Sequence, residues 1–211
     1  MNRIFPPAFL AALALSLAVT ASPVRAADFS DPEWPCIQRK VPHLWPGQMW
    51  AGPPIPDPLP DWRADADVAE LAHLLAARRT SDAEAEALIA DFAAGLGEDR
   101  AQRLTLLFAG AFALIDAERT QIIGGIGRYA RKQTALADRL DATREAASAL
   151  EARPSLSFDE ADKLEALQDQ ILWDTRIFKE RQQSLTYVCE SPVILEQRAF
   201  WLARTIMAQL P

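Results

Sequence analysis

Two long stretches in the second half of the chain have a heptad rhythm of mostly apolar residues, as helices that pack side by side do. In residues 122–150 the alternating steps of four and three run through Ile122, Ile126, Tyr129, Gln133, Leu136, Leu140, Thr143, Ala147 and Leu150. After a turn signal at Arg153-Pro154, apolar residues recur every seven positions at Leu164, Ile171, Phe178 and Leu185. We therefore predict an all-α helical bundle that contains a long antiparallel coiled-coil-like hairpin over about residues 98–189.

Helix-end signals predict where the other helices begin and end. Apolar spacing predicts a helix over about residues 64–78. A capping box at residues 81–84 opens a second helix, which ends near Gly95 and Gly97. A second capping box, at residues 157–160, begins the second arm of the hairpin.

A separate last helix is predicted over about residues 192–210. Ser191-Pro192 combines a good N-cap residue with a proline at the first helical position. Cys189 would then lie at a corner between the hairpin and this helix. Folding the hairpin about residue 154 places Gln133 near Thr175.

The segment before the helices is rich in proline and tryptophan. Nine of the 15 prolines and four of the six tryptophans fall within residues 28–62. Proline at this density excludes helix interiors and central strands, so we expect an extended strap over residues 27–62, packed across a bundle domain of residues 63–211. The alternative is that exposed tryptophans of the strap dock a partner.

Residues 1–26 have the layout of a secretory signal peptide. A basic start at Arg3 precedes an apolar run over about residues 9–19, and the small-residue site Val24-Arg25-Ala26 predicts cleavage after Ala26. No later stretch approaches about 18 uninterrupted apolar residues. We expect a periplasmic protein with no membrane attachment after cleavage.

Two cysteines, Cys36 and Cys189, are the only ones in the chain. In an oxidising compartment such a pair is typical of a structural disulfide. There is no Cys-x-x-Cys motif, which excludes a thioredoxin-like or c-type haem site. In the loop-entropy model a bridge of this separation contributes roughly 5 kcal/mol at most.

The charge balance and the motifs exclude several classes of function. Removal of the signal leaves 20 basic and 29 acidic residues, and this acidic balance is unsuited to nucleic acid. His43 and His73 are the only histidines and lack the spacing of a metal site. No glycine-rich phosphate loop and no Gly-x-Ser-x-Gly elbow is present. We predict neither a metal nor a cofactor.

Many charged residues lie along the first hairpin arm, Arg119 among them, and we expect most of them to form a solvated face. Four of the charged residues in this region, Lys132, Asp141, Arg144 and Glu145, have a spacing that resembles the all-helical AroQ-type chorismate mutases. The resemblance implies a cofactor-free site in which cationic side chains bind two carboxylates of the substrate and stabilise the transition state.

The resemblance covers about 15 residues and departs from the family at two points. Helix-forming residues 134–137 replace the loop and proline of the family, and Gln121 stands where the family has an upstream arginine, with Arg119 displaced by two positions.

Our main hypothesis is a non-enzymatic adaptor, assembly factor or chaperone-like accessory that binds another periplasmic protein. The candidate contact residues are Trp45, Trp50, Arg128 and Tyr129. A third possibility is a helical bundle that binds a small ligand. Its pocket would be lined by Trp173, Trp201 and the glycine patch, which consists of Gly124, Gly125 and Gly127.

Overall fold

The computed structural model describes residue 31 and residues 33–211. The predicted signal peptide and the first residues of the strap lie outside this part of the chain. The described residues form two short 3-10 helices and four α-helices, and no strand. Their bounds are η1 Pro46–Gln48, η2 Trp62–Ala64, α1 Ala66–Ala76, α2 Asp82–Ala94, α3 Arg100–Glu151 and α4 Phe158–Met207.

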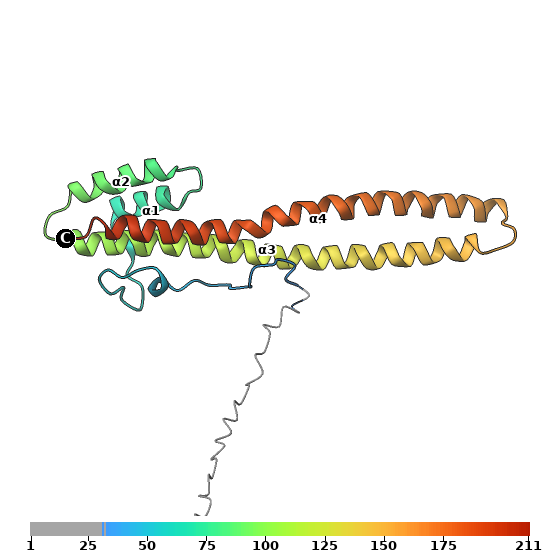
Figure 1. Cartoon of the computed structure of the whole chain (residues 1–211), viewed down its shortest axis with the longest axis horizontal. Helices are drawn as coiled ribbons and strands as arrows, with labels where there is room; N and C mark the ends of the chain where they lie inside the picture. Colours follow the sequence, from blue (N-terminus) through green and yellow to red (C-terminus); the bar gives the residue numbers. More distant parts are fainter. Residues whose placement is uncertain (1–30, 32) are drawn as a thin grey trace, which may run out of the picture.

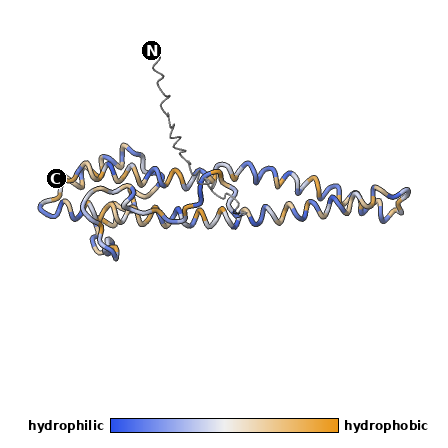
Figure 2. The backbone as a smooth tube through the Cα atoms, turned by 60° about the horizontal axis from the view of Figure 1, so that its bottom comes forward, coloured by the Kyte–Doolittle hydropathy of each residue, from blue (hydrophilic) through white to orange (hydrophobic). Residues whose placement is uncertain are grey.

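The hairpin of α3 and α4 dominates the molecule. The two helices have 52 and 50 residues and run antiparallel along their whole length (Figure 1). Hydrophobic and hydrophilic residues alternate along both arms, as expected for helices that bury one face (Figure 2). The predicted all-α fold with a long helical hairpin is confirmed. No helix in the described part of the chain has the length and apolar character needed to cross a membrane.

The predicted seam lies between the two arms, but its register differs from the prediction. Ile126, Leu136 and Leu140 are buried as expected. Gln133 Nε2 donates to the Phe178 carbonyl at 2.8 Å, three residues further along α4 than the predicted Thr175. Part of the difference arises because the turn between Glu151 and Phe158 is centred after Pro154.

The prediction of a separate last helix was wrong. α4 continues through Ser191 and Pro192 to Met207, so Cys189 lies within a helix and not at a corner. Proline costs about 3 kcal/mol inside a helix because it lacks the N–H group and crowds the preceding turn. Burial of Leu195 and Ile206 beyond the proline offsets this cost, since each fully buried side chain contributes about 1.5–3 kcal/mol. α4 changes direction in this region but stays helical (Figure 1).

The main core lies where α3 begins and α4 ends, and α1 and α2 cover that end of the hairpin (Figure 1). Side chains from all four helices meet there in one cluster, which includes Val68, Leu75, Ile89, Phe108 and Leu202. The far half of the hairpin consists of α3 and α4 alone in Figure 1.

The described part of the strap packs on this body, as predicted. Leu44, Met49 and Trp62 are buried in the main core. The Trp50 ring stacks on the Phe108 ring with centroids 4.5 Å apart and planes 6° apart. The strap therefore contributes to the core and is fastened to the helices over most of its length.

Candidate functional site

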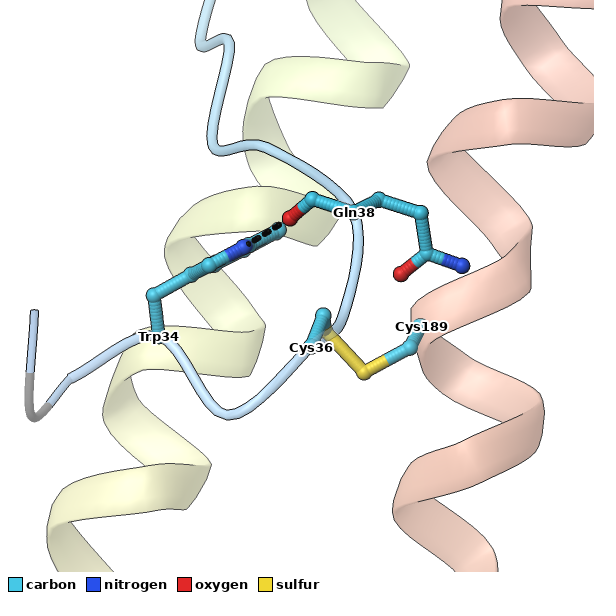
Figure 3. Close-up of a disulfide and its surroundings, with 4 residues drawn as sticks. All are labelled: Trp34, Cys36, Gln38 and Cys189. Atoms are coloured by element: carbon cyan, nitrogen blue, oxygen red, sulfur yellow. Dashed lines mark hydrogen bonds between the residues drawn. A yellow bond between two sulfur atoms is a disulfide. The ribbon is translucent and has the colours of Figure 1, made fainter. Parts of the chain in front are cut away.

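The predicted disulfide between Cys36 and Cys189 is present. It joins the strap to the middle of α4, with the two Cα atoms 5.6 Å apart (Figure 3). Both cysteines are buried in a small cluster with Ile126. The Trp34 indole N–H donates to the Gln38 carbonyl at 2.5 Å, closing a short loop around Cys36 (Figure 3).

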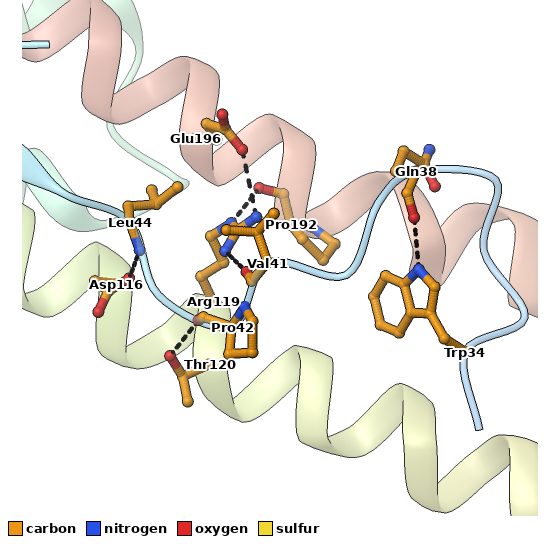
Figure 4. A network of polar contacts seen from close by, with 10 residues as sticks. All are labelled: Trp34, Gln38, Val41, Pro42, Leu44, Asp116, Arg119, Thr120, Pro192 and Glu196. Carbon is orange, nitrogen blue, oxygen red and sulfur yellow. Dashed lines mark hydrogen bonds and ion pairs between the residues drawn. The ribbon is translucent and has the colours of Figure 1, made fainter. Parts of the chain in front are cut away.

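A buried arginine holds the strap against both arms of the hairpin. Arg119 of α3 is 4% exposed, and its guanidinium donates to the carbonyls of Val41 and Pro192 and to the Glu196 carboxylate (Figure 4). The Nε···O distance to Pro192 is 3.2 Å and the Nη2···Oε2 distance to Glu196 is 3.3 Å. One side chain thus connects the strap, α3 and α4.

The expectation that Arg119 belongs to a solvated face was therefore wrong. Its position, four residues after the buried Ile115 and three before Ile122, continues the spacing of the seam. That spacing was the available signal that its side chain points inward.

Two neighbours of Arg119 on α3 also bind the strap (Figure 4). Asp116 accepts a hydrogen bond from the Leu44 backbone N–H at 2.8 Å, and its second carboxylate oxygen lies 3.0 Å from His43 Nδ1. The Thr120 hydroxyl donates to the Pro42 carbonyl at 2.9 Å. Residues 42–44 of the strap are therefore fixed along α3.

The two tryptophans predicted to contact a partner lie in opposite environments. Trp50 is 8% exposed in the core, so its ring is not available for docking. Trp45 is 74% exposed although the adjacent Leu44 is buried. Ile37 and Val41 of the strap are exposed as well. We call Ile37, Val41 and Trp45 the strap surface.

Arg128 and Tyr129 are not brought together with Trp45. Asp116 binds the strap beside Trp45. Arg128 comes twelve positions after Asp116, which corresponds to about 18 Å along α3. Arg128 is exposed beside Gly124. Tyr129 is half-buried, and its hydroxyl donates to the Arg181 carbonyl at 3.1 Å. Tyr129 is therefore occupied within the hairpin.

The four residues of the chorismate mutase resemblance are all exposed. Arg144 pairs with Asp141 at 3.1 Å and lies 3.5 Å from the Thr175 hydroxyl. Asp141, Arg144 and Thr175 line a groove of about 260 Å³ between the arms. Lys132 and Glu145 lie outside this groove. Lys132 lies about 18 Å from Arg144 along α3. The described residues do not gather these groups into an enclosed site.

The hypothetical ligand pocket is not formed. Trp173 and Trp201 both lie on α4, 28 residues or about 42 Å apart. α3 remains helical through Gly124, Gly125 and Gly127, so these glycines are not a helix break. Gly127 faces the Glu33 carbonyl, where the strap crosses α3.

A larger groove lies at the other end of the molecule. It measures about 540 Å³ and separates the α1–α2 connection from α4, with Arg78, Arg204 and Trp201 among its lining residues. Arg198 closes one side by donating to the Leu75 carbonyl and to Asp82. Within the described part of the chain no group of three or more metal-binding side chains is placed to hold an ion.

A row of exposed apolar residues follows the face of α4 that points away from α3. Its members are the four most exposed large apolar side chains of this helix, and we call them the α4 stripe: Phe158, Leu172, Trp173 and Tyr187. No residue of this stripe was selected as a contact residue from the sequence, although Phe158 and Leu172 are two heptads apart.

Comparisons of the chain with protein-family models, with curated proteins and with solved structures found no match. Function is therefore inferred from the geometry of this chain.

Proposed function

We propose that this is an exported, periplasmic, non-enzymatic protein that acts through protein–protein contacts, as an adaptor or assembly accessory. The docking site is the strap surface, with Trp45 as its main contact residue. The observation that carries the proposal is the environment of Trp45. A tryptophan that is 74% exposed lies on a segment that is otherwise fastened to the body.

The attachment of the strap supports this function. The disulfide at Cys36 holds one end of the strap surface, and the hydrogen bonds to Asp116 and Thr120 hold the other. A rigid surface loses little conformational entropy when it binds. Large aromatic side chains on such surfaces dominate the binding energy of protein interfaces.

The side chains between the apolar residues indicate the chemistry of the partner. Arg39 is exposed between Ile37 and Val41, whereas the neighbouring Lys40 already pairs with Asp31 of the strap at 2.8 Å. A complementary surface would offer an apolar pocket for the indole and a carboxylate for the Arg39 guanidinium. We therefore propose an exported protein with an acidic rim around an apolar pocket as the partner.

Site-specific photo-crosslinking in intact cells tests this function. A photoreactive residue at position 45 or 37 is expected to give one discrete adduct with a second protein. The matched control is position 67, since Asp67 is exposed on α1 outside the strap. Equal adducts at all three positions, or none at position 45, would contradict the proposal. An adduct of exactly two copies of this chain at position 45 would also contradict it.

A pair of tryptophan substitutions separates docking from folding. Trp45→Ala should leave the melting temperature nearly unchanged, because the side chain is exposed. Trp50→Ala should lower the free energy of unfolding by about 3–5 kcal/mol, because the buried ring leaves a cavity beside Phe108. Loss of the adduct at position 37 in Trp45→Ala, with stability retained, is the expected result. A large loss of stability in Trp45→Ala would assign this residue a structural role instead.

A further inference from the structure

The α4 stripe has a symmetric arrangement along the helix. At 3.6 residues per turn its four members fall within an arc of about 100°, on the side opposite the inward-facing Ile171 and Phe178. Phe158 and Tyr187 lie equally far from the point midway between Leu172 and Trp173. They are also the most exposed of the four, at 93% and 75%.

Such an arrangement is what a two-fold symmetric interface requires. In an interface between two identical copies, residue i of one copy contacts residue j of the other, and j contacts i in turn. If two α4 helices cross antiparallel about the midpoint of the stripe, Leu172 of each copy lies against Trp173 of the other. Phe158 of each copy then lies against Tyr187 of the other.

The charges of the far half of the hairpin fit the same arrangement. The tip, residues 142–170, has seven acidic and three basic side chains, a net charge of −4. The adjoining middle, residues 128–141 and 171–184, has seven basic and four acidic side chains, a net charge of +3. An antiparallel pair places each acidic tip on the basic middle of the other copy.

The same two-fold axis also brings together charged residues that lie beside the stripe. Asp169 of one copy comes opposite Arg176 of the other, because both are equally far from the midpoint. Glu165 comes opposite Glu180 across the same axis. Arg176 also pairs with Glu180 of its own helix at 2.8 Å, so one arginine on each side of the apolar centre faces acidic side chains from both copies.

The fold leaves room for a second copy over this length. The stripe runs from residue 158 to residue 187, about 43 Å along α4. The turn of the second copy, at Pro154, would reach Ser191 of the first. The second copy would therefore end before Ile194, the first residue of α4 that lines the groove beside the α1–α2 connection.

We propose that two copies of this chain associate through the α4 stripe and form an antiparallel four-helix bundle from the far halves of their hairpins. The two-fold axis passes between Leu172 and Trp173. This interface is separate from the strap surface, so it does not depend on the proposed adaptor function. Each dimer would present two strap surfaces, one beside each end of the shared four-helix segment.

Sedimentation equilibrium of the full mature chain tests the association. The expected result is a dimer whose dissociation constant rises with salt, since the charges of the tip and the middle are screened. Trp173→Glu should weaken association by more than about tenfold, because a carboxylate would be buried at the axis. The matched control is Trp45→Glu, which alters a similarly exposed tryptophan outside the stripe and should leave the dimer intact. A monomer at all concentrations, or equal effects of the two substitutions, would overturn the proposal.

Charge exchange tests the two-fold axis itself. Asp169→Arg alone should weaken the dimer, and adding Arg176→Asp should restore it, because the exchange rebuilds the pair between copies. Failure of the double variant to restore association would reject this axis. A photoreactive residue at position 158 should crosslink to the peptide around Tyr187, whereas a crosslink between two copies of position 158 would indicate a different orientation. The crosslinks from position 45 report separately on the adaptor function.

Discussion

At the scale of single residues, the closest packing against a glycine of α3 occurs at Gly110, a position that no sequence pattern marked. A Cβ atom on Gly110 would lie 2.8 Å from the indole of Trp62, and both residues are buried. The glycine patch of residues 124, 125 and 127 is packed less closely. A Cβ atom on Gly124 would meet just the flexible end of Arg128, at 3.4 Å. Gly110 is thus the glycine of α3 that allows the last tryptophan of the strap region to enter the core.

Alanine substitutions at these two glycines should have opposite effects. Gly110→Ala should lower the free energy of unfolding by about 1–3 kcal/mol, because the added methyl group overpacks the core against Trp62. Gly124→Ala, in the same helix, should raise it by up to about 1 kcal/mol, since alanine has the higher helix propensity. Urea denaturation monitored by circular dichroism measures both. Equal effects would show that helix propensity, and not the contact with Trp62, controls position 110.

At the scale of elements, the start of α1 depends on an ion pair with α3. Asp65 caps α1 by accepting a hydrogen bond from the Val68 N–H at 3.2 Å. Its carboxylate also accepts two hydrogen bonds from the Arg103 guanidinium, at 2.8 and 2.9 Å. The hydrogen bonds from Arg103, with a smaller contribution from the Val68 N–H, lower the pKa of Asp65 below its ordinary value of 3.8.

The lowered pKa gives a pH dependence of stability with a definite sign. The ionised carboxylate stabilises the folded state above the pKa of the unfolded chain, and this contribution is lost as the pH falls through the lower pKa of the folded state. Asp65→Asn keeps the cap but removes the charge, so at pH 7 it should destabilise the protein by about 1 kcal/mol. The difference from the wild type should shrink below about pH 4. Thermal unfolding from pH 7 to pH 3 measures this, and a difference that is constant with pH would contradict it.

At the scale of the whole molecule, the disulfide and the core hold different parts of the strap. The bridge from Cys36 holds the start of the described strap on α4, whereas Met49, Trp50 and Trp62 belong to the main core. The two cysteines are 153 residues apart in sequence, so the bridge constrains most of the unfolded chain.

Removal of the disulfide should therefore weaken the fold globally and loosen the strap locally. Cys36→Ser with Cys189→Ser should lower the free energy of unfolding, by at most about 5 kcal/mol. Hydrogen exchange should increase most over residues 34–41 and least over residues 49–62, because the latter remain in the core. An unchanged denaturation midpoint would contradict this prediction. Two free thiols in a non-reducing mass analysis of the isolated protein would show that the bridge does not form.

Local patterns in the sequence were sufficient for the fold class, the hairpin, both capped helix starts and the cysteine pair. Heptad spacing and capping boxes are read over a few adjacent residues, and the helices they predict form wherever their apolar faces are covered. The strap was also predictable, since proline density alone excludes a helix. Localisation, the partner and any activity stay predictions.

The tertiary structure decided the features that depend on residues distant in the chain. Pro192 remained inside α4 because the core beyond it buries Leu195 and Ile206, an effect that Ser191-Pro192 cannot reveal by itself. Arg119 is buried and joins the strap to α4 because the Val41 and Pro192 carbonyls both lie within hydrogen-bond reach of its guanidinium. Trp50 is buried because its ring stacks on Phe108, whereas Trp45 remains exposed. Periodicity along one helix predicts which face is covered, but the identity of what covers it is set by packing between segments.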